Sequence, residues 1–338
     1  MSTNTTARLP NLKDHALIGD ADKIPISPAT PVISINPLVL PAPDRIIDLH
    51  IRVSVPSTGT NLPIILLSHG QGQSNNLSSL NGYSPVANFL AAHGFVVIQP
   101  THLSSKTLNL GPEAGVDAPL FWHSRVLDMK LILDRLDDIE AGFPVLKTRL
   151  DHDRVAVVGH SMGGHTASML LGARKINSTT GPEGLDLSDP RIKTGVLLAP
   201  PGDGNGGEGL TPLVRENYTF LAEHSHAEMA GPALVVVGDS DASAYLSTRG
   251  AEYHADAYYR SRGPKALLTV AGGCHGLGGV SGYDTAEATD DESPQRLAMV
   301  LRLTWAYLRS TLYSGDQAWS VACGALESLP ALGKVESK

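Results

Sequence analysis

The stretch that decides the fold reads Val155-Ala156-Val157-Val158-Gly159-His160-Ser161-Met162-Gly163-Gly164-His165. Its apolar half ends at Gly159 and small residues then allow a helix to begin at once, so the stretch predicts a strand, a sharp turn and a helix. Gly159 and Gly163 lack the Cβ atoms that would collide in so tight a turn, which can hold the hydroxyl of Ser161 above a sheet. The pattern Gly-x-Ser-x-Gly is weak alone, since chance produces it in roughly a quarter of chains of this composition. An ordinary glycine-rich turn with an inert serine is the alternative.

The composition describes a large globular chain without a strongly charged surface. It has 338 residues, a formal net charge of −8 and 42% hydrophobic residues, which fits one large domain with an ample core. No cluster of Lys and Arg supplies the electrostatic footprint of a protein that binds nucleic acid or an anionic membrane surface. We therefore expect a small neutral or apolar substrate and no nucleic acid.

Cysteine content and the N-terminal residues indicate the compartment. Cys274 and Cys323 are too few for a disulfide scaffold, and we interpret them as free thiols in a reducing environment. Residues 1–10 are polar and lack a charged segment followed by an apolar one, so no secretory signal is visible. No apolar run approaches the roughly 20 residues that span a bilayer. These features predict a cytoplasmic protein without a membrane span.

Hydrophobic patterning divides the chain into an N-terminal arm (1–30), one domain (31–313) and a C-terminal tail (314–338). The arm is polar and proline-rich, without sustained periodicity. In the domain, alternating apolar and polar residues predict two opening strands, 32–35 and 45–53. Short continuous apolar runs predict strands that are buried on both faces, at 63–68, 95–98, 154–158, 194–199, 233–237 and 266–270. Helical patterns occur at 84–93, 121–139, 162–173 and 294–313.

This order of strands and helices predicts an α/β fold. The buried strands should form a mostly parallel central sheet with antiparallel N-terminal strands and helices on both faces. In such folds the functional residues lie beyond the carboxyl ends of the strands, where the connecting loops gather. The long loops 101–120 and 200–231 follow strand ends, so we expect them to form pocket walls or a lid.

A serine nucleophile at position 161 needs a base within hydrogen-bond reach. His275 is the best placed of the thirteen histidines, because it follows the last predicted strand in a glycine-rich loop that can turn its side chain across the sheet edge. His160 and His165 flank the serine, but adjacent side chains in such a turn normally diverge, so we expect them to pack or hydrogen-bond beneath it. His224 and His226 form a close pair without a third ligand at a recognisable spacing, so we expect no bound metal.

The base needs an acid that orients it, and three carboxylates follow strand ends. Asp239 and Asp241 come after the run 233–237, and Asp203 comes after the strand before it. We favour Asp241, because a residue several places beyond its strand can reach toward a loop histidine, whereas Asp239 suits a turn or cap. The chain order of serine, acid and histidine is the same for all three, so Asp203 and Asp239 remain alternative acids.

Acyl transfer also needs hydrogen-bond donors directed at the developing oxyanion. The backbone N–H of Met162, the residue after the serine, is one expected donor. The other is the backbone N–H of Gln71, in the loop Ser68-His69-Gly70-Gln71-Gly72 that follows a buried strand. The alternative is a glycine-rich loop whose only role is to turn the chain.

Taken together, these motifs resemble the α/β-hydrolase fold, from about Val32 to Tyr313. The Ser-His-Gly loop at 68–70 and the Gly-His-Ser-Met-Gly-Gly turn at 159–164 are similar to those of dienelactone hydrolases, chlorophyllases and platelet-activating-factor-acetylhydrolase-like proteins. The last two branches imply an acid directly after the strand that ends at 198–199, where this sequence has Pro200 and Pro201. This departure favours Asp241. Dienelactone hydrolases use a cysteine nucleophile, so Ser161 argues against their specific reaction.

The residues and the resemblance together predict a serine hydrolase that needs no cofactor. We expect it to cleave an ester or lactone of a small, largely apolar substrate through an acyl-enzyme. The same machinery cleaves thioesters, amides and carbamates, so the sequence determines the mechanism more closely than the type of bond that is cleaved. A noncatalytic protein that holds a small apolar ligand on the same fold is the alternative from another class.

Overall fold

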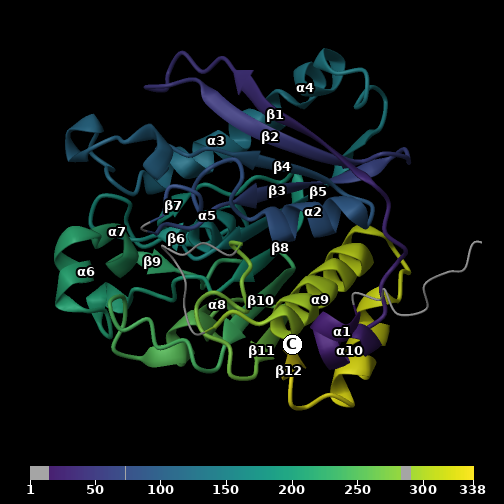
Figure 1. The fold of residues 1–338 in the computed structure, drawn as a ribbon. Helices are drawn as coiled ribbons and strands as arrows, with labels where there is room; N and C mark the ends of the chain where they lie inside the picture. The colour runs from purple at the N-terminus through teal and green to yellow at the C-terminus, as the bar shows by residue number, and fades with distance from the viewer. Residues whose placement is uncertain (1–14, 73, 283–290) are drawn as a thin grey trace, which may run out of the picture.

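Strand β5 (Leu150–His160) occupies the centre of the main sheet and leads into Ser161. The computed structural model describes residues 15–72, 74–282 and 291–338. Within these ranges the main sheet has nine strands in the order β1-β2-β4-β3-β5-β8-β10-β11-β12 (Figure 1). The other strands are β1 (Val32–Leu40), β2 (Leu49–Pro56), β3 (Leu62–Ser68), β4 (Val96–Pro100), β8 (Ile192–Leu198), β10 (Ala233–Gly238), β11 (Lys265–Val270) and β12 (Gly333–Ser337).

The pairing of the strands confirms the predicted α/β-hydrolase arrangement. β4, β3, β5, β8, β10 and β11 run parallel to one another, whereas β1 and β2 join antiparallel at one edge and β12 at the other. Helices cover both faces of these parallel strands, so both faces carry apolar side chains. This is why each strand is a continuous apolar run in the sequence. Their carboxyl ends meet at one edge of the sheet, which is where Ser161, Asp241 and His275 follow β5, β10 and β11.

Alternate side chains of each strand pack into two separate cores. Ile64 and Leu66 contribute to one core, and Ile65 and Leu67 to the other, as the two-residue period of a strand requires. The first core is covered by α3 (Trp122–Asp134), α4 (Leu136–Gly142) and α5 (Met162–Leu170). The second is covered by α2 (Ser84–Ala92), α9 (Pro294–Leu312) and α10 (Ala318–Glu327).

The two long loops contain short elements of their own. Loop 101–120 holds η2 (Lys106–Leu108) and η3 (Pro112–Ala114), and 200–231 holds η4 (Asn205–Gly207), α6 (Pro212–Asn217), α7 (Thr219–Ala222) and β9 (His224–Ser225). β9 pairs with β6 (Arg174–Lys175), which pairs with β7 (Leu185–Asp186), so insertion 200–231 is tied to the segment after α5. Segment η5 (Gly250–Ala255) and helix α8 (Asp256–Tyr259) lie between β10 and β11.

Some segments differ from the sequence predictions. The helix predicted at 121–139 is interrupted at Arg135, which leaves helical geometry between α3 and α4. The C-terminal tail forms α10 and the antiparallel edge strand β12, neither of which was predicted. Residues 1–14 of the predicted arm lie outside the described residues, whereas 15–23 form α1 (His15–Ile18) and η1 (Gly19–Lys23) beside α9. Within the described residues, no helix is long and apolar enough to cross a bilayer.

The turn after β5 requires glycine because backbones approach each other there. A Cβ on Gly159 would lie 2.0 Å from the carbonyl oxygen of Gly163. A Cβ on Gly163 would lie 2.0 Å from the carbonyl oxygen of Ser68, at the end of β3. Since both obstacles are backbone atoms, the glycines are what allow β5, β3 and α5 to pack this closely.

We predict that Gly163→Ala destabilises the protein by about 3 kcal/mol or more, because overpacking against backbone forces the elements apart. Denaturant unfolding measures the change. Gly324→Ala in α10 is the matched control: its Cβ meets open space, and we expect a gain of about 0.5–1 kcal/mol. Equal effects of the two substitutions on the free energy of unfolding would contradict the inference that close backbone packing requires glycine at position 163.

Candidate active site

Ser161 lies between β5 and α5 in a strained backbone conformation. Its φ of 55° and ψ of −119° are rarely adopted by a residue with a side chain. Its backbone N–H donates to the carbonyl of Leu198 at 2.9 Å, which ties the turn to the end of β8. Helix α5 begins at Met162, so the N–H of Met162 is among the first four of the helix, which lack a carbonyl partner within it. This is the geometry of a nucleophile elbow.

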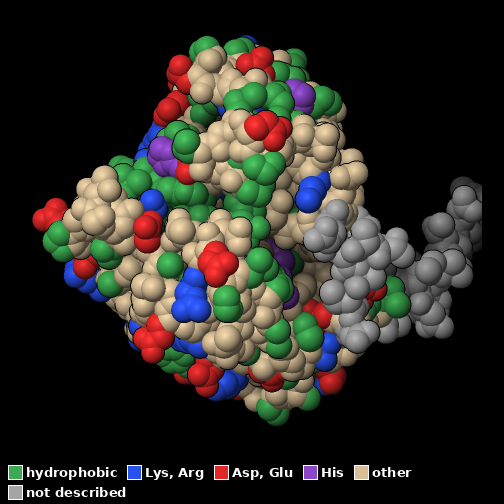
Figure 2. All heavy atoms as spheres, turned by 90° about the vertical axis from the view of Figure 1, so that its left-hand side faces the viewer, with side chains coloured by type: hydrophobic (Ala, Val, Ile, Leu, Met, Phe, Trp, Pro, Cys, Tyr) green, Lys and Arg blue, Asp and Glu red, His purple; other side chains and the backbone are tan. Residues whose placement is uncertain are grey.

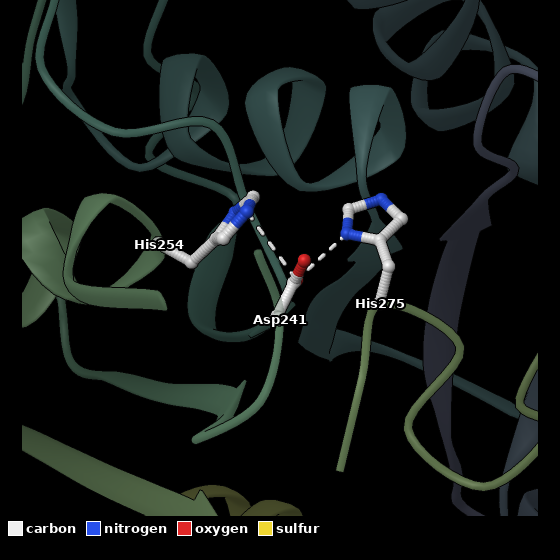
Figure 3. A group of neighbouring side chains, drawn as sticks. All are labelled: Asp241, His254 and His275. Atoms are coloured by element: carbon white, nitrogen blue, oxygen red, sulfur yellow. Dashed lines mark hydrogen bonds and ion pairs between the residues drawn. The ribbon is translucent and has the colours of Figure 1, made fainter. Parts of the chain in front are cut away.

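The structure brings His275 and Asp241 together. Nδ1 of His275 lies 2.8 Å from Oδ2 of Asp241 (Figure 3). Asp241 is buried, and its other oxygen, Oδ1, accepts a hydrogen bond from the Ser243 hydroxyl at 2.5 Å. Because a carboxylate only accepts, Nδ1 of His275 carries the hydrogen, and Nε2 is left to take a proton. Among the described residues, this Nε2 has no hydrogen-bond partner, Ser161 included. Such bonds often tighten only when a substrate binds.

The two alternative acids have other partners. Oδ1 of Asp203 accepts hydrogen bonds from the backbone N–H of His226 at 2.9 Å and from its Nδ1 at 2.5 Å. Asp239 is exposed, and its Oδ1 accepts from the N–H of Gly272 and the hydroxyl of Ser240, at 2.8 and 2.9 Å. Asp239 thus hydrogen-bonds within the turns that follow β10 and β11. The geometry supports Asp241 as the partner of the base.

His160 connects the three loops of the site. The N–H of Gly70 donates to the Tyr83 hydroxyl at 3.0 Å, which lies 2.8 Å from Nδ1 of His160. Nε2 of His160 lies 2.7 Å from the carbonyl oxygen of His275, so Nε2 must be the donor. Burial lowers the pKa of His160 to about 3, so the ring is neutral and Nδ1 accepts from Tyr83. His160 therefore positions the loop of His275, as expected for a histidine beneath the turn.

His165, in the first turn of α5, lies in an aromatic environment. Its ring centroid is 4.5 Å from that of His224, 5.2 Å from that of Phe220 and 6.2 Å from that of Trp122. Burial lowers the pKa of His165 to about 3, and the charges of His226 and Arg125 lower it further in the same direction. His165 is thus a neutral packing residue, also as expected.

Arg125 anchors the loop that holds Gln71. Its guanidinium is fully buried, and it donates to the carbonyl oxygen of His69, two residues before Gln71. It also donates to the hydroxyls of Ser104 at 2.6 Å and Thr166 at 3.2 Å. Thr166 lies in α5, so Arg125 joins the predicted oxyanion loop to the helix that begins at Met162.

A second buried chain of polar groups lies behind the same loop. Nε2 of His102 lies 2.9 Å from the hydroxyl of Ser68, and Nδ1 of His102 lies 2.8 Å from Oδ2 of Asp128. Arg45 completes the chain through a 2.9 Å contact with Oδ1 of Asp128. Burial raises the pKa of Asp128 to about 6 despite the opposing effect of Arg45, so this carboxylate depends on its partners to remain ionised.

The face of the molecule that carries α6 and α7 is hollowed. Figure 2 shows a depression with recessed histidine atoms, beside a patch of hydrophobic side chains. A cavity of about 500 Å³ is lined by residues of insertion 200–231, including Asp203, Glu223 and His224. A second cavity, of about 120 Å³, is lined by both long loops, with Leu120, Trp122 and Phe220 among its residues. Ser161 does not line either cavity.

Sequence reasoning missed several residues of the site. Tyr83 and His102 reach the loops from elements that carry no motif, and no local spacing could have revealed them. His254, in η5, was also missed: its Nε2 lies 3.3 Å from Oδ2 of Asp241 (Figure 3). The one sequence feature that could have indicated a role for His254 is its position between the two strands whose ends carry Asp241 and His275.

The chain has the α/β-hydrolase fold, and two comparisons find similar proteins of that fold. Residues 39–181 match the family model described as Chlorophyllase. The chain is also similar to a platelet-activating factor acetylhydrolase of Bos taurus, with 27% identity over 150 residues, or 34% of this chain. The matched region spans 33% of the length of that relative.

We predict that Asp128→Asn lowers the free energy of unfolding by about 3–5 kcal/mol, because it leaves the nearly buried charge of Arg45 without its partner. Denaturant unfolding measures this loss. Asp138→Asn is the matched control, since Asp138 pairs with Arg135 at the surface and such pairs contribute about 0–1 kcal/mol. Similar small losses in both variants would contradict a structural role for the buried chain.

The neutral state of His165 generates a prediction for pH. The folded protein keeps this ring unprotonated down to about pH 3, whereas an unfolded chain protonates it below about pH 6.5, so its burial disfavours folding as the pH falls below 6.5. The stability of wild type relative to His165→Gln should therefore fall by about 1.4 kcal/mol per pH unit between pH 6 and 4. Unfolding curves at several pH values measure this difference, and parallel stability profiles would contradict the assignment.

Proposed function

We propose that the protein is a serine hydrolase that cleaves a carboxylic ester or lactone of a small, largely apolar substrate. The observation that carries the proposal is the 2.8 Å hydrogen bond between His275 and the buried Asp241, at the same sheet edge as the strained Ser161. A base paired to a buried acid beside an elbow serine is the arrangement that activates a hydroxyl nucleophile.

The reaction proceeds in two halves. Nε2 of His275 accepts the hydroxyl proton of Ser161 as Oγ attacks the carbonyl carbon, and the backbone N–H groups of Gln71 and Met162 stabilise the tetrahedral oxyanion. The leaving oxygen takes the proton from His275, which completes the acyl-enzyme. Water then attacks this ester, again giving a proton to His275, and the acid is released with Ser161 restored.

Asp241 has the protonation state that this reaction needs. Burial alone would raise its pKa, but its hydrogen bond to His275 and the charge of that ring hold the pKa of Asp241 well below its usual range. The carboxylate therefore remains ionised near neutral pH and stabilises the imidazolium of His275 as it forms. No cofactor is required for any step.

The relatives and the aromatic residues near the elbow support the substrate class. An acetylhydrolase, as the name of the relative states, removes an acetyl group by hydrolysis. Trp122 and Phe220 stack with ring centroids 5.8 Å apart, and both rings contact His165, four residues after Ser161, which places aromatic surface near the elbow. Thioester or amide cleavage would use the same triad, and a noncatalytic binder would use only the cavity.

Active-site labelling separates an enzyme from a binding protein. We predict that a fluorophosphonate probe labels the wild type and that Ser161→Ala abolishes labelling, because the probe reacts only with an activated serine. Asp241→Asn should lower kcat by roughly 10²–10⁴-fold, whereas Asp203→Asn should retain most of the activity. Loss of activity in Asp203→Asn with activity retained in Asp241→Asn would reverse the assignment of the acid.

The same preparations can be assayed with nitrophenyl esters of graded acyl length, a lactone, a thioester and an amide. We expect the esters or the lactone to give the highest kcat/KM. A fully folded protein that neither labels nor hydrolyses any of them would contradict the proposal and favour the noncatalytic alternative.

A further inference from the structure

Asp241 faces two histidines, of which the proposed reaction uses only one. His254 is buried, and its Nε2 lies 3.3 Å from Oδ2 of Asp241, on the opposite side from His275 (Figure 3). One nitrogen of each ring and a carboxylate oxygen of Asp241 lie within 4.8 Å of one another. Two imidazoles and one carboxylate form a ligand set that is typical of Zn²⁺ sites with three protein ligands.

The hydrogen bonds around His254 fix which of its nitrogens carries the hydrogen. Nδ1 lies 2.8 Å from the carbonyl oxygen of Pro200, and a carbonyl can only accept. Nδ1 is therefore protonated, which leaves the lone pair of the neutral ring on Nε2, the nitrogen that faces Asp241. Among the described residues, this buried Nε2 has no hydrogen-bond partner. A lone pair facing a carboxylate is unfavourable unless a cation lies between them.

We propose that His254, Asp241 and His275 form a binding site for a divalent transition-metal cation, with Zn²⁺ as the ion that fits it, and that its occupancy inhibits hydrolysis. His254 and Asp241 have the outer partners that metal ligands commonly have, whereas His275 is held through its backbone. Pro200 orients His254, the Ser243 hydroxyl occupies Oδ1 of Asp241 and leaves Oδ2 for the cation, and His160 holds the backbone of His275.

The separation of His254 and Asp241 fits a tetrahedral ion. Two ligands at about 2.0–2.1 Å from Zn²⁺ are separated by about 3.3 Å when their bonds meet at the tetrahedral angle. Nε2 of His254 and Oδ2 of Asp241 are 3.3 Å apart already. Nδ1 of His275 is 2.8 Å from the same oxygen and has to move away from it by about half an ångström for the cation to bind both atoms. The His275 side chain is 26% exposed, which offers the cation a route from solvent and a position for a water ligand.

Binding of the cation and catalysis exclude each other. A cation bound to Nδ1 of His275 forces the ring hydrogen onto Nε2, which can then no longer accept the proton of Ser161. The cation also separates His275 from Asp241. The inhibition rests on the proposed function, whereas the binding of the cation does not.

The binding is tested on the full chain after treatment with a chelator. We expect calorimetry to find one Zn²⁺ per chain at this site, and Co²⁺, as a spectroscopic probe, to show the strong visible absorption of a tetrahedral site. His254→Gln and His254→Phe should each weaken Zn²⁺ binding by at least about tenfold. Ser161→Ala should bind Zn²⁺ as the wild type does, because Ser161 is not a ligand.

His152→Gln is the matched control. His152 also contacts two carboxylates, Glu140 at 3.1 Å and Asp137 at 3.4 Å, but it lies on the surface far along the chain from the site. Its replacement should leave the affinity for Zn²⁺ unchanged. If the His254 variants fail to fold, X-ray absorption of the Zn²⁺-loaded wild type provides the test, with two imidazole ligands expected.

Inhibition is measured as the ratio of activity with and without Zn²⁺ for each variant. Zn²⁺ should inhibit the wild type reversibly, chelator should restore activity, and the His254 variants should require at least about tenfold more Zn²⁺. Absence of tight Zn²⁺ binding, equal affinity in the His254 variants, or loss of binding in His152→Gln would overturn the site. A wild type without esterase activity that still binds one Zn²⁺ through His254 would contradict the proposed function and leave the site standing.

Discussion

A chain of three hydrogen bonds holds the site together. It runs from the N–H of Gly70 through the hydroxyl of Tyr83 and the ring of His160 to the carbonyl of His275. These groups belong to the loop after β3, the segment before α2, the end of β5 and the loop after β11. Because these hydrogen bonds are buried, a shift of one loop that breaks one of them costs about 1–3 kcal/mol. The relative positions of Gln71, Ser161 and His275 depend on this chain.

The elbow and most of the sheet could be predicted because their causes are local. Gly159 and Gly163 mark a backbone contact that admits no Cβ, and the apolar runs mark strands covered on both faces. β12 was missed because an edge strand is partly exposed and its residues, 333–337, lack a continuous apolar run. The break at Arg135 was missed because the apolar pattern continues through it, from α3 into α4.

The triad acid shows where sequence reasoning ends. Asp203, Asp239 and Asp241 are equivalent by chain order, and only their partners in space distinguish them. Asp203 is bound to His226 and Asp239 to a turn, which leaves Asp241 for His275. Those partners come from distant parts of the chain, so no spacing encodes them. The same is true of His254, whose approach to Asp241 depends on how η5 packs between β10 and β11.

Burial assigns different roles to histidines that lie close together. It lowers the pKa values of His160, His165 and His254 to about 3, 3 and 4, so these rings are neutral and act through packing and fixed hydrogen bonds. His275 is partly exposed and bound to an ionised carboxylate. Among these four rings, only His275 combines a hydrogen bond to an ionised carboxylate with an Nε2 that has no hydrogen-bond partner among the described residues, which is what a general base needs.

The most direct test of the account is to trap the acyl-enzyme. The wild type is mixed with a nitrophenyl ester, quenched in acid within the first turnover, digested and analysed by mass spectrometry. The account predicts that the acyl group is attached to Ser161 and disappears as turnover continues. An unmodified Ser161 in a protein that hydrolyses the ester, or an acyl group on another residue such as Cys274, would contradict it.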